Sequence, residues 1–398
     1  MTLADWDFPP YAVSLADVLP AVLASIGHPI APPGAPPIAL PGAPPIALPG
    51  APSEPEILLP PAHSAVVALI DGLGANQLQR RSGHAPFLRR LNSAAPELRC
   101  GFPSTTATSL TSFGTGLAAG QHGVIGTLAP TTCGTELFSH LTWEGGPDPA
   151  AYQPAPTFLQ AAHAAGVAVT TVSRPAFKGS GLTRAALHGG AFIGAASANQ
   201  RVAATLQALR KATGPALVYL YIDEVDKAGH GFGPNSWQWG ESVENADQIL
   251  REVAAGMPSG TSLSVTADHG MIEAPITDRF DVAAHPDLAE GVRLLGGDPR
   301  AAHVFCEPGA AGDVATRWKA VMGGAAVILT RDEAIEAGWF GPVAGDFRSR
   351  IGDVVTAMTG QFTVLDSRAC RPAFLRLLGH HGSMSEEETG IPLLHLPA

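Results

Sequence analysis

Four apolar runs, separated by segments with helical periodicity, constrain the fold of this chain most. The runs are Ser64–Ile70, Val167–Val172, Ala216–Ile222 and Ser262–Thr266. Runs rich in β-branched residues and lacking polar alternation are typical of strands buried on both faces. Helical patterns accompany them at Ala85–Ala94, Pro156–Ala165, Ser197–Ala212 and Trp237–Ala255. This alternation predicts an α/β fold in which helices flank a mostly parallel central sheet.

Two segments precede the alternating region. Residues 14–26 place an apolar stripe on one helical face, with Ser14 as a cap and Pro20 expected to kink the helix. The octet GAPPIALP then occurs at Gly34–Pro41 and again at Gly42–Pro49, a proline-rich period typical of an extended linker. We therefore divide the chain into an N-terminal helical segment (1–30), a Pro/Gly/Ala-rich repeat linker (31–56) and a large globular domain (57–398).

Charge and cysteine content argue against several classes of protein. The chain has 24 basic and 35 acidic residues, a net charge of −11 and no basic block, so binding to a nucleic-acid polymer is not expected. No apolar run approaches the ~20 residues that span a membrane, and the N-terminus lacks a basic region typical of signal peptides. Four cysteines without a C-x-x-C pair favour reduced thiols and a cytoplasmic location.

Four short motifs place acidic and imidazole side chains where strands or loops should end. They are IDGLG with Asp71, IDEVDKAGHGFG with Asp223, Asp226 and His230, TADHGM with Asp268 and His269, and GHHGS with His380 and His381. Ligands of open α/β sheets bind beyond the carboxyl ends of the strands. Asp and His suit zinc or a similar divalent ion. Each motif alone fits a turn or a cap, so it is their joint occurrence that indicates a metal site.

The spacing of Asp226 and His230 allows two interpretations. Four residues are about one turn of a helix, which would place both side chains on one face. Gly229 and Gly231 weaken a helix and favour a tight loop, which is the local structure that we expect. The acidic run Ser385–Glu388 is expected to be a solvated helix start.

The stretch Gly101–Gly123 reads GFPSTTATSLTSFGTGLAAGQHG and has seven hydroxyl side chains in the nine positions from Ser104 to Ser112. Ser104 or Thr105 suits the N-cap of a helix. A hydroxyl in the first helical turn would lie at the positive end of the helix, where a phosphoryl group also binds favourably. Composition alone leaves open whether the stretch is only a capped helix start or also carries a nucleophile.

The order of these motifs resembles the alkaline phosphatase superfamily, and within it the nucleotide pyrophosphatase/phosphodiesterase branch. An Asp is followed by a Thr-rich stretch that ends in TGL and precedes HG, and then by DxxGH, ADHGM and GxHG. The resemblance covers about residues 66–394 and implies an alkaline phosphatase-like core. The span between His269 and His381 is too long for a loop, so we expect a small α+β cap insertion at about residues 273–378.

The resemblance implies two divalent metal ions, usually zinc, and a threonine nucleophile. One ion would be held by Asp226, His230 and His381, and the other by Asp71, Asp268 and His269. The family pattern GxHG selects His381 over His380, and the family spacing of four selects Asp226 over Asp223. The pattern P-x-x-T, counted back nine residues from Thr115 of TGL, makes Thr106 the nucleophile, with its oxygen directed at the second metal.

The implied activity is cleavage of phosphodiester or nucleotide pyrophosphate bonds through a phospho-threonine intermediate, with a small phosphate ester or nucleotide as substrate. The family Asn that binds a phosphoryl oxygen is here Thr127, and the family Phe after the nucleophile is here Ala107. Tyr221 matches a base-stacking Tyr, and Lys178 is a further candidate for substrate binding. The alternatives are a phosphomonoesterase or phosphonate hydrolase of the same superfamily, or a catalytically silent metal-binding scaffold.

Overall fold

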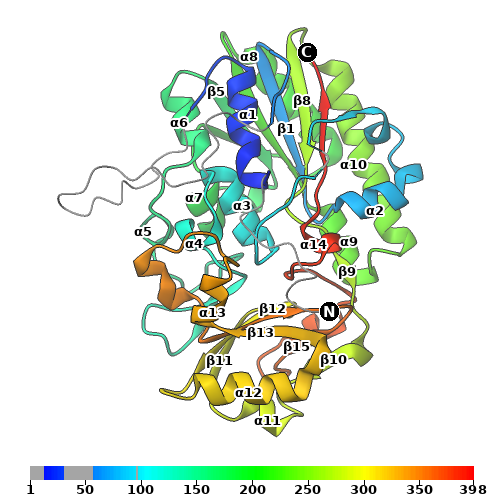
Figure 1. Cartoon of the computed structure of the whole chain (residues 1–398). Coiled ribbons are helices and arrows are strands. Elements are labelled where there is room, and N and C mark those ends of the chain that lie inside the picture. The colour runs from blue at the N-terminus through cyan, green and yellow to red at the C-terminus, as the bar shows by residue number, and fades with distance from the viewer. Residues whose placement is uncertain (1–12, 31–56, 96) are drawn as a thin grey trace, which may run out of the picture.

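Two β-sheets organise the chain, the larger in the upper half of Figure 1 and the smaller in the lower half. The structure is a computed structural model and describes residues 13–30, 57–95 and 97–398. The proposed repeat linker at 31–56 lies outside the described residues.

The larger sheet has seven strands in the order β2-β17-β8-β1-β7-β5-β6. Their bounds are β2 (Asn92–Ser93), β17 (Leu393–Leu396), β8 (Thr261–Thr266), β1 (Ser64–Ile70), β7 (Ala216–Ile222), β5 (Ala168–Ser173) and β6 (Ala191–Gly194). The five strands from β8 to β6 run parallel, whereas β17 is antiparallel to both of its neighbours. Every residue of the central strands β1 and β7 is buried. The predicted α/β class with a mostly parallel sheet is confirmed.

Two groups of helices cover this sheet, and Figure 1 shows α1 and α10 on opposite sides of the strands. One group comprises α1 (Val18–Ser25), α3 (Thr106–Thr115), α6 (Phe158–Ala164) and α7 (Gly181–Ala186). The other comprises α8 (Ala198–Lys211), α9 (Glu224–Phe232) and α10 (Trp237–Gly256). Shorter helices are α2 (Ala75–Arg80), α4 (Ala119–His122), α5 (Pro149–Tyr152) and α14 (Glu386–Thr389). No described helix is long and apolar enough to cross a membrane.

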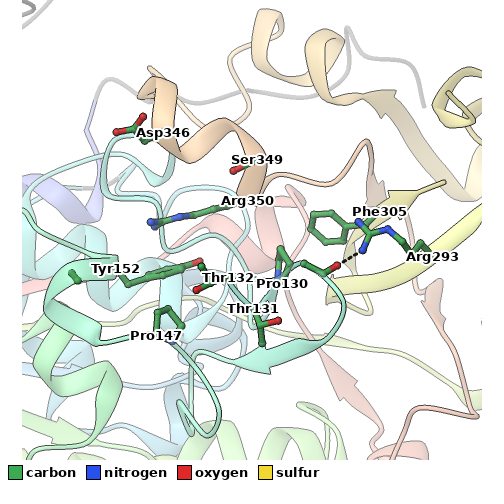
Figure 2. A pocket seen from close by; sticks show the side chains of 12 residues that line it. Pro130, Thr131, Thr132, Pro147, Tyr152, Arg293, Phe305, Asp346, Ser349 and Arg350 are labelled. Carbon is green, nitrogen blue, oxygen red and sulfur yellow. Dashed lines mark hydrogen bonds between the residues drawn. The ribbon is translucent and has the colours of Figure 1, made fainter. Parts of the chain in front are cut away.

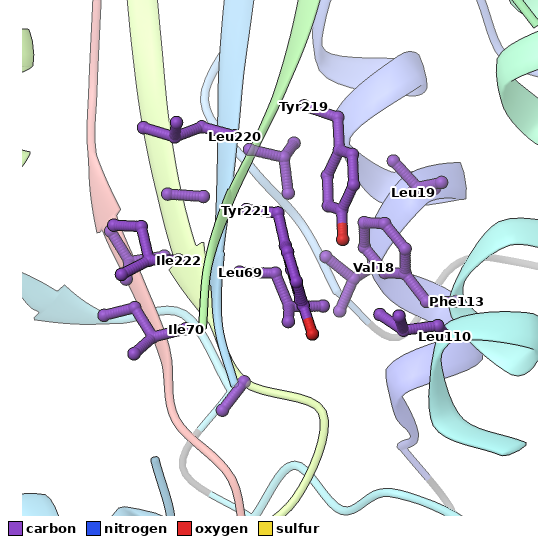
Figure 3. Packing of buried hydrophobic residues seen from close by; sticks show 14 of the residues in the cluster. Val18, Leu19, Leu69, Ile70, Leu110, Phe113, Tyr219, Leu220, Tyr221 and Ile222 are labelled. Carbon is purple, nitrogen blue, oxygen red and sulfur yellow. The ribbon is translucent and has the colours of Figure 1, made fainter. Parts of the chain in front are cut away.

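The N-terminal helix packs into the core of the larger sheet. The short 3₁₀ turn η2 (Leu15–Asp17) leads into α1, and the predicted apolar stripe of this segment is buried. Figure 3 shows Val18 and Leu19 beside Leu110 and Phe113 of α3 and near Tyr219 of β7. Pro20 is the third residue of α1, in its first turn, where its missing N–H is tolerated.

The prediction of a helix at Ala85–Ala94 is wrong. This segment contains only the 3₁₀ turn η4 (Leu88–Arg90) and strand β2. The backbone N–H groups of Phe87 and Leu88 donate to the carboxylate of Asp247 in α10, at distances of 2.8 to 3.1 Å. Contacts with α10 and with β17 therefore override the local helical pattern.

The smaller sheet has six antiparallel strands in the order β13-β14-β12-β11-β3-β4. Their bounds are β13 (Ala326–Thr330), β14 (Val354–Met358), β12 (Ala301–Cys306), β11 (Val292–Asp298), β3 (Leu128–Pro130) and β4 (Leu137–Ser139). The accompanying helices are α11 (Pro286–Ala289), α12 (Ala311–Met322) and α13 (Arg331–Glu336). Two further pairs are β10 (Arg279–Asp281) with β15 (Thr363–Leu365) and β9 (Ile272–Glu273) with β16 (Gly379–His380).

This α+β unit occupies the span proposed as a cap, but it also draws on earlier chain. Strands β3 and β4 precede β5 in sequence and complete the smaller sheet from outside residues 273–378. The unit is therefore joined to the larger sheet by the segment between α4 and β3 as well as by the two ends of the insertion. The exact domain boundaries stay a prediction.

Candidate active site

The carboxyl ends of three adjacent strands bring most of the predicted site residues together. Asp71 directly follows β1, Asp268 and His269 lie just after β8, and Asp226 lies on α9, which begins after β7. Gly72 has a φ of +73°, and a Cβ atom at this position would lie 2.9 Å from the Cα atom of Asp226. A glycine is therefore required here both for the turn after β1 and for the close approach of α9.

The first cluster consists of Asp226, His230 and His381, whose ligand atoms lie within 4.8 Å of one another. Nδ1 of His230 lies 2.7 Å from the carbonyl oxygen of Gly379, and Nδ1 of His381 lies 2.9 Å from that of Ser104. Because a carbonyl only accepts, both Nδ1 atoms carry a proton, which leaves Nε2 as the atom that each ring can offer to a metal. These Nε2 atoms are 3.2 Å apart, and Oδ1 of Asp226 is 3.4 and 3.7 Å from them.

Three electron-rich atoms therefore face one another in the first cluster. Burial, followed by the neighbouring imidazoles of His269 and His230, lowers the pKa of His381 well below its ordinary value, so that this ring is neutral. Oδ1 of Asp226 has no hydrogen-bond partner among the described residues. Imidazoles that donate Nδ1–H to a backbone carbonyl and direct Nε2 inward are typical of metal ligands.

The second cluster consists of Asp71, Asp268 and His269, and all three are buried. Nδ1 of His269 donates to the carbonyl of Gly270 at 3.0 Å, while its Nε2 lies 3.4 Å from Asp71 and 3.5 Å from Asp268. Burial, followed by the charges of the neighbouring carboxylates, raises the pKa of Asp71 well above its ordinary value. Oδ2 of Asp268 has no hydrogen-bond partner in the described part of the chain. A cation would satisfy these buried oxygens.

The two clusters form one site. The rings of His269 and His381 stack with their centroids 3.6 Å apart, so the two clusters adjoin. Asp226 of the first cluster and Asp71 of the second line the same cavity. His380 lies outside both clusters, and burial lowers its pKa to about 3. Asp223 is also outside them and pairs with Arg174 instead. The sequence-based preference for His381 over His380 and for Asp226 over Asp223 therefore agrees with the geometry.

The loop expected around Gly229 and Gly231 is wrong, because Asp226 and His230 occupy one turn of α9. Gly229 has a packing role instead. A Cβ atom there would lie 2.4 Å from Sδ of Met271, and a Cβ atom on Gly379 would lie 2.3 Å from the carbonyl oxygen of Gly229. The glycines let β16 approach α9 closely, which places His381 opposite His230.

Thr106 is the first residue of α3 and the only hydroxyl between Ser104 and Ser112 that is not buried. Its Oγ1 lies 3.1 Å from Nε2 of His269 and 3.5 Å from Oδ1 of Asp71. Thr105 is the N-cap by position, and its hydroxyl donates to Thr108. The N-terminal N–H groups of α3 lie beside the Thr106 hydroxyl and favour an anion there.

A cavity of about 220 Å³ opens beside Thr106, with Asp71 and Asp226 on its wall. Most of the remaining wall is apolar and includes Leu110, Leu141, Phe177, Leu182, Leu187 and Phe192. Tyr221 also lines the cavity, and its hydroxyl donates to Oδ2 of Asp71. Burial, followed by the charge of Asp71, raises the pKa of Tyr221 well above its ordinary value, which keeps this donor protonated.

The structure does not bring Thr127 and Lys178 onto the lining of this cavity. Thr127 is half-buried, and its N–H donates to Oδ2 of Asp298 at 3.0 Å. Lys178 is exposed, while its neighbour Phe177 faces the cavity. Sequence reasoning missed Lys227, which lines the cavity one residue after Asp226 and was present within the IDEVDKAGHGFG motif.

A second cavity, of about 450 Å³, lies between the β3–β4 turn, α5 and the 3₁₀ turn η8 (Gly345–Arg350), as Figure 2 shows. Its wall includes Tyr152, and the guanidinium of Arg350 lies 3.6 Å from the centroid of that ring. None of the predicted site residues lines it. This larger cavity is therefore separate from the two Asp/His clusters and from Thr106.

A mostly parallel sheet whose carboxyl edge carries two Asp/His clusters, with a threonine at a helix N-terminus beside them, is the arrangement that the resemblance to the alkaline phosphatase superfamily predicts. The family model of type I phosphodiesterase / nucleotide pyrophosphatase matches residues 65–384. The chain belongs to this family, and family membership makes it one of the phosphoesterase/pyrophosphatase hydrolases. No curated protein matches the sequence.

Solved structures show the same fold at low sequence identity. Murine ectonucleotide pyrophosphatase / phosphodiesterase 5 is 19% identical with a TM-score of 0.67, covering 83% of this chain and 87% of that chain. Phosphonoacetate hydrolase from Sinorhizobium meliloti 1021, in complex with phosphonoacetate, is 23% identical with a TM-score of 0.64, covering 84% and 90%. An inactive variant of the murine protein in complex with AMP, 18% identical with a TM-score of 0.66, covers 84% and 87%.

Proposed function

We propose that the protein is a two-metal phosphoryl hydrolase that cleaves phosphodiester or nucleotide pyrophosphate bonds through a phospho-threonine intermediate on Thr106. The observation that carries this proposal is the position of the Thr106 hydroxyl. It is the accessible hydroxyl of its stretch, and it lies 3.1 Å from Nε2 of His269 in the second ligand cluster. A hydroxyl so placed at a helix N-terminus suits nucleophilic attack on an anionic phosphoryl group.

The residues of both clusters fit divalent metals, with zinc as the ion that mixed Asp and His ligands favour. Asp226, His230 and His381 would hold one ion, and Asp71, Asp268 and His269 the other. The carboxylate oxygens without hydrogen-bond partners and the facing Nε2 atoms support this assignment. When bound, the two ions supply Lewis-acid stabilisation of the charge on the phosphoryl, attacking and leaving oxygens.

The residues of the chain orient the reaction around Thr106. Its Oγ1 attacks phosphorus in line, so that an Oγ1–P bond forms as the bond to the leaving oxygen breaks, and the hydroxyl proton is released to solvent water, from which the leaving oxygen can take a proton. Water then attacks phosphorus and restores the free threonine. The N–H groups of α3 bind the phosphoryl oxygens, while Tyr221 donates to Asp71 and fixes that carboxylate. The apolar cavity accommodates an organic substituent of the substrate.

We expect purified protein loaded with zinc to hold two ions per chain, as elemental analysis would measure. Chelation should lower the Tm, because a ligand of the folded state stabilises it.

The difference in Tm between zinc-loaded and metal-free protein should also widen as pH rises. In metal-free protein the raised pKa of Asp71 provides stability that is present at low pH and lost as pH rises through that pKa, whereas bound metal prevents the loss. Well under two ions, or no effect of chelation, would contradict the assignment.

A phosphonate hydrolase is the second candidate. Ala107 in place of the family Phe removes one aromatic side chain from nucleotide recognition, and phosphonoacetate hydrolase is among the structural neighbours. The backbone N–H of Thr127, which replaces the family Asn, donates to Asp298, and Thr127 is not among the residues that line the cavity. Both departures concern the substrate and leave the Thr106 site unchanged.

A panel of three substrates separates these candidates. Zinc-loaded protein would be assayed with bis-p-nitrophenyl phosphate, p-nitrophenyl phosphate and a p-nitrophenyl phosphonate ester. We expect the diester to have the highest kcat/KM, because the cavity beside Thr106 accommodates an apolar substituent. A preference for the monoester would contradict the diesterase assignment, and turnover of none of the three would favour a silent scaffold.

A further inference from the structure

A group of charged side chains borders the apolar cavity on the side of α9. Asp223 follows β7, is buried and lines the cavity. Its carboxylate accepts from Nε of Arg174 at 2.6 Å and from Nζ of Lys227, and Nη2 of Arg201 lies 3.4 Å away. Arg174 and Arg201 also pair with Glu224, at distances of 2.8 to 3.1 Å.

This group carries one positive charge in excess, because three cations share the two carboxylates of Asp223 and Glu224. Burial alone would raise the pKa of Asp223, but the hydrogen bonds from Lys227 and Arg174 lower it below its ordinary value. Both carboxylates are thus committed to their partners. Asp226 and Asp71 line the same cavity but belong to the candidate metal clusters, so the excess cation of this group is the charge left to meet an incoming anion.

Lys227 is the member of the group that presents this charge to the cavity. Its side chain is 53% exposed, whereas that of Arg201 is 1% exposed. Lys227 and Thr106 line the same cavity of about 220 Å³, so one small ligand can reach both. An ammonium has three N–H donors, and Asp223 takes one of them. The others are available to a ligand.

We propose that Lys227 forms an anion subsite that selects substrates with a carboxylate on the organic substituent of the phosphoryl group. This inference rests on the proposed function and names its substrate class. Leu110, Leu182 and Phe192 would contact the carbon skeleton, while Lys227 pairs with the terminal charge. A single excess charge in a small cavity matches a monoanionic carboxylate better than a second phosphate, which carries more charge and volume.

The test measures binding directly, by calorimetry on the zinc-loaded protein. The ligands are 4-phosphonobutanoate, its terminal amide, and the analogue with a phosphate in place of the carboxylate. We expect the wild type to bind the carboxylate about tenfold tighter than the amide, as one charge-assisted hydrogen bond provides. Lys227→Met should remove this preference and Lys227→Arg should retain most of it. Lys319→Met, at an exposed lysine on α12, should keep it.

Equal affinity of the wild type for the carboxylate and the amide would overturn the proposal, as would a preference that survives in Lys227→Met and Lys227→Gln. Tighter binding of the phosphate analogue would overturn the choice of carboxylate. The p-nitrophenyl esters of the same phosphonates separate this inference from the proposed function. Turnover without carboxylate preference would remove only the subsite, whereas carboxylate preference in binding without turnover would support the subsite and contradict the hydrolase.

Discussion

Thr106→Ala should reduce kcat for the preferred phosphate ester by roughly 10³-fold or more, the scale at which removal of a nucleophile is measured in other hydrolases. The hydroxyl is partly exposed and lies beside the second cluster, 3.1 Å from His269 and 3.5 Å from Asp71. No neighbouring hydroxyl can replace it, because the other six in the stretch are buried. Steady-state turnover, at matched zinc content, measures the loss.

Two variants serve as controls for this experiment. Thr106→Ser keeps a hydroxyl at the same position and should retain far more activity than Thr106→Ala. Thr105→Ser changes the adjacent residue, whose hydroxyl donates to Thr108, and should have a small effect. In the wild type, mass spectrometry after rapid acid quench should find a phosphoryl group on the peptide that contains Thr106. Equal turnover by wild type and Thr106→Ala would contradict the nucleophile assignment.

Glu388→Gln should lower the free energy of unfolding by about 3–5 kcal/mol, since it leaves a buried charge without its partner. The side chains of Arg300 and Glu388 are fully buried and form two hydrogen bonds, of 3.0 and 2.7 Å. Arg300 also donates to the carbonyls of Thr359 and Phe362. Glu388 accepts from the N–H of Ser383, two residues after His381. The pair thus connects the smaller sheet to the segment that carries a candidate metal ligand.

Urea unfolding of the single and double variants tests whether this cost comes from the unpaired charge. Arg300→Met combined with Glu388→Gln should recover part of the loss, because Gln still accepts from Ser383 and no charge remains buried. The exposed pair of Arg80 and Glu387 is the matched control from the same acidic run. Arg80→Met should cost about 1 kcal/mol or less. A double variant less stable than Glu388→Gln would contradict this explanation.

The central strands could be predicted from the sequence because their apolar runs report directly on burial. Ser64–Ile70 and Ala216–Ile222 coincide with β1 and β7, and the polar residues after them lie at the expected edge. The choice of Thr106 among seven hydroxyls needed the family pattern, because composition cannot tell which side chain faces solvent. The structure adds a physical criterion, the burial of the other six.

Features that depend on distant partners could not be predicted. Glu388 was expected to be solvated, but Arg300, 88 residues away, pairs with it in the interior. The helix expected at Ala85–Ala94 does not form, because the backbone N–H groups of Phe87 and Leu88 donate to Asp247 of α10. Lys178 was named as a substrate-binding candidate and Lys227 was missed, since only the fold shows that Lys227 lines the cavity.

Helix α1 packs against the helix that begins with Thr106, and a shortened version of the protein must keep this contact. The family match begins at residue 65, yet Val18 and Leu19 lie against Leu110 and Phe113 of that helix. A truncation at the start of the family match would expose an apolar face of α3, the helix that begins with Thr106. The packed core is thus larger than the segment that the family match covers, because α1 contributes to it.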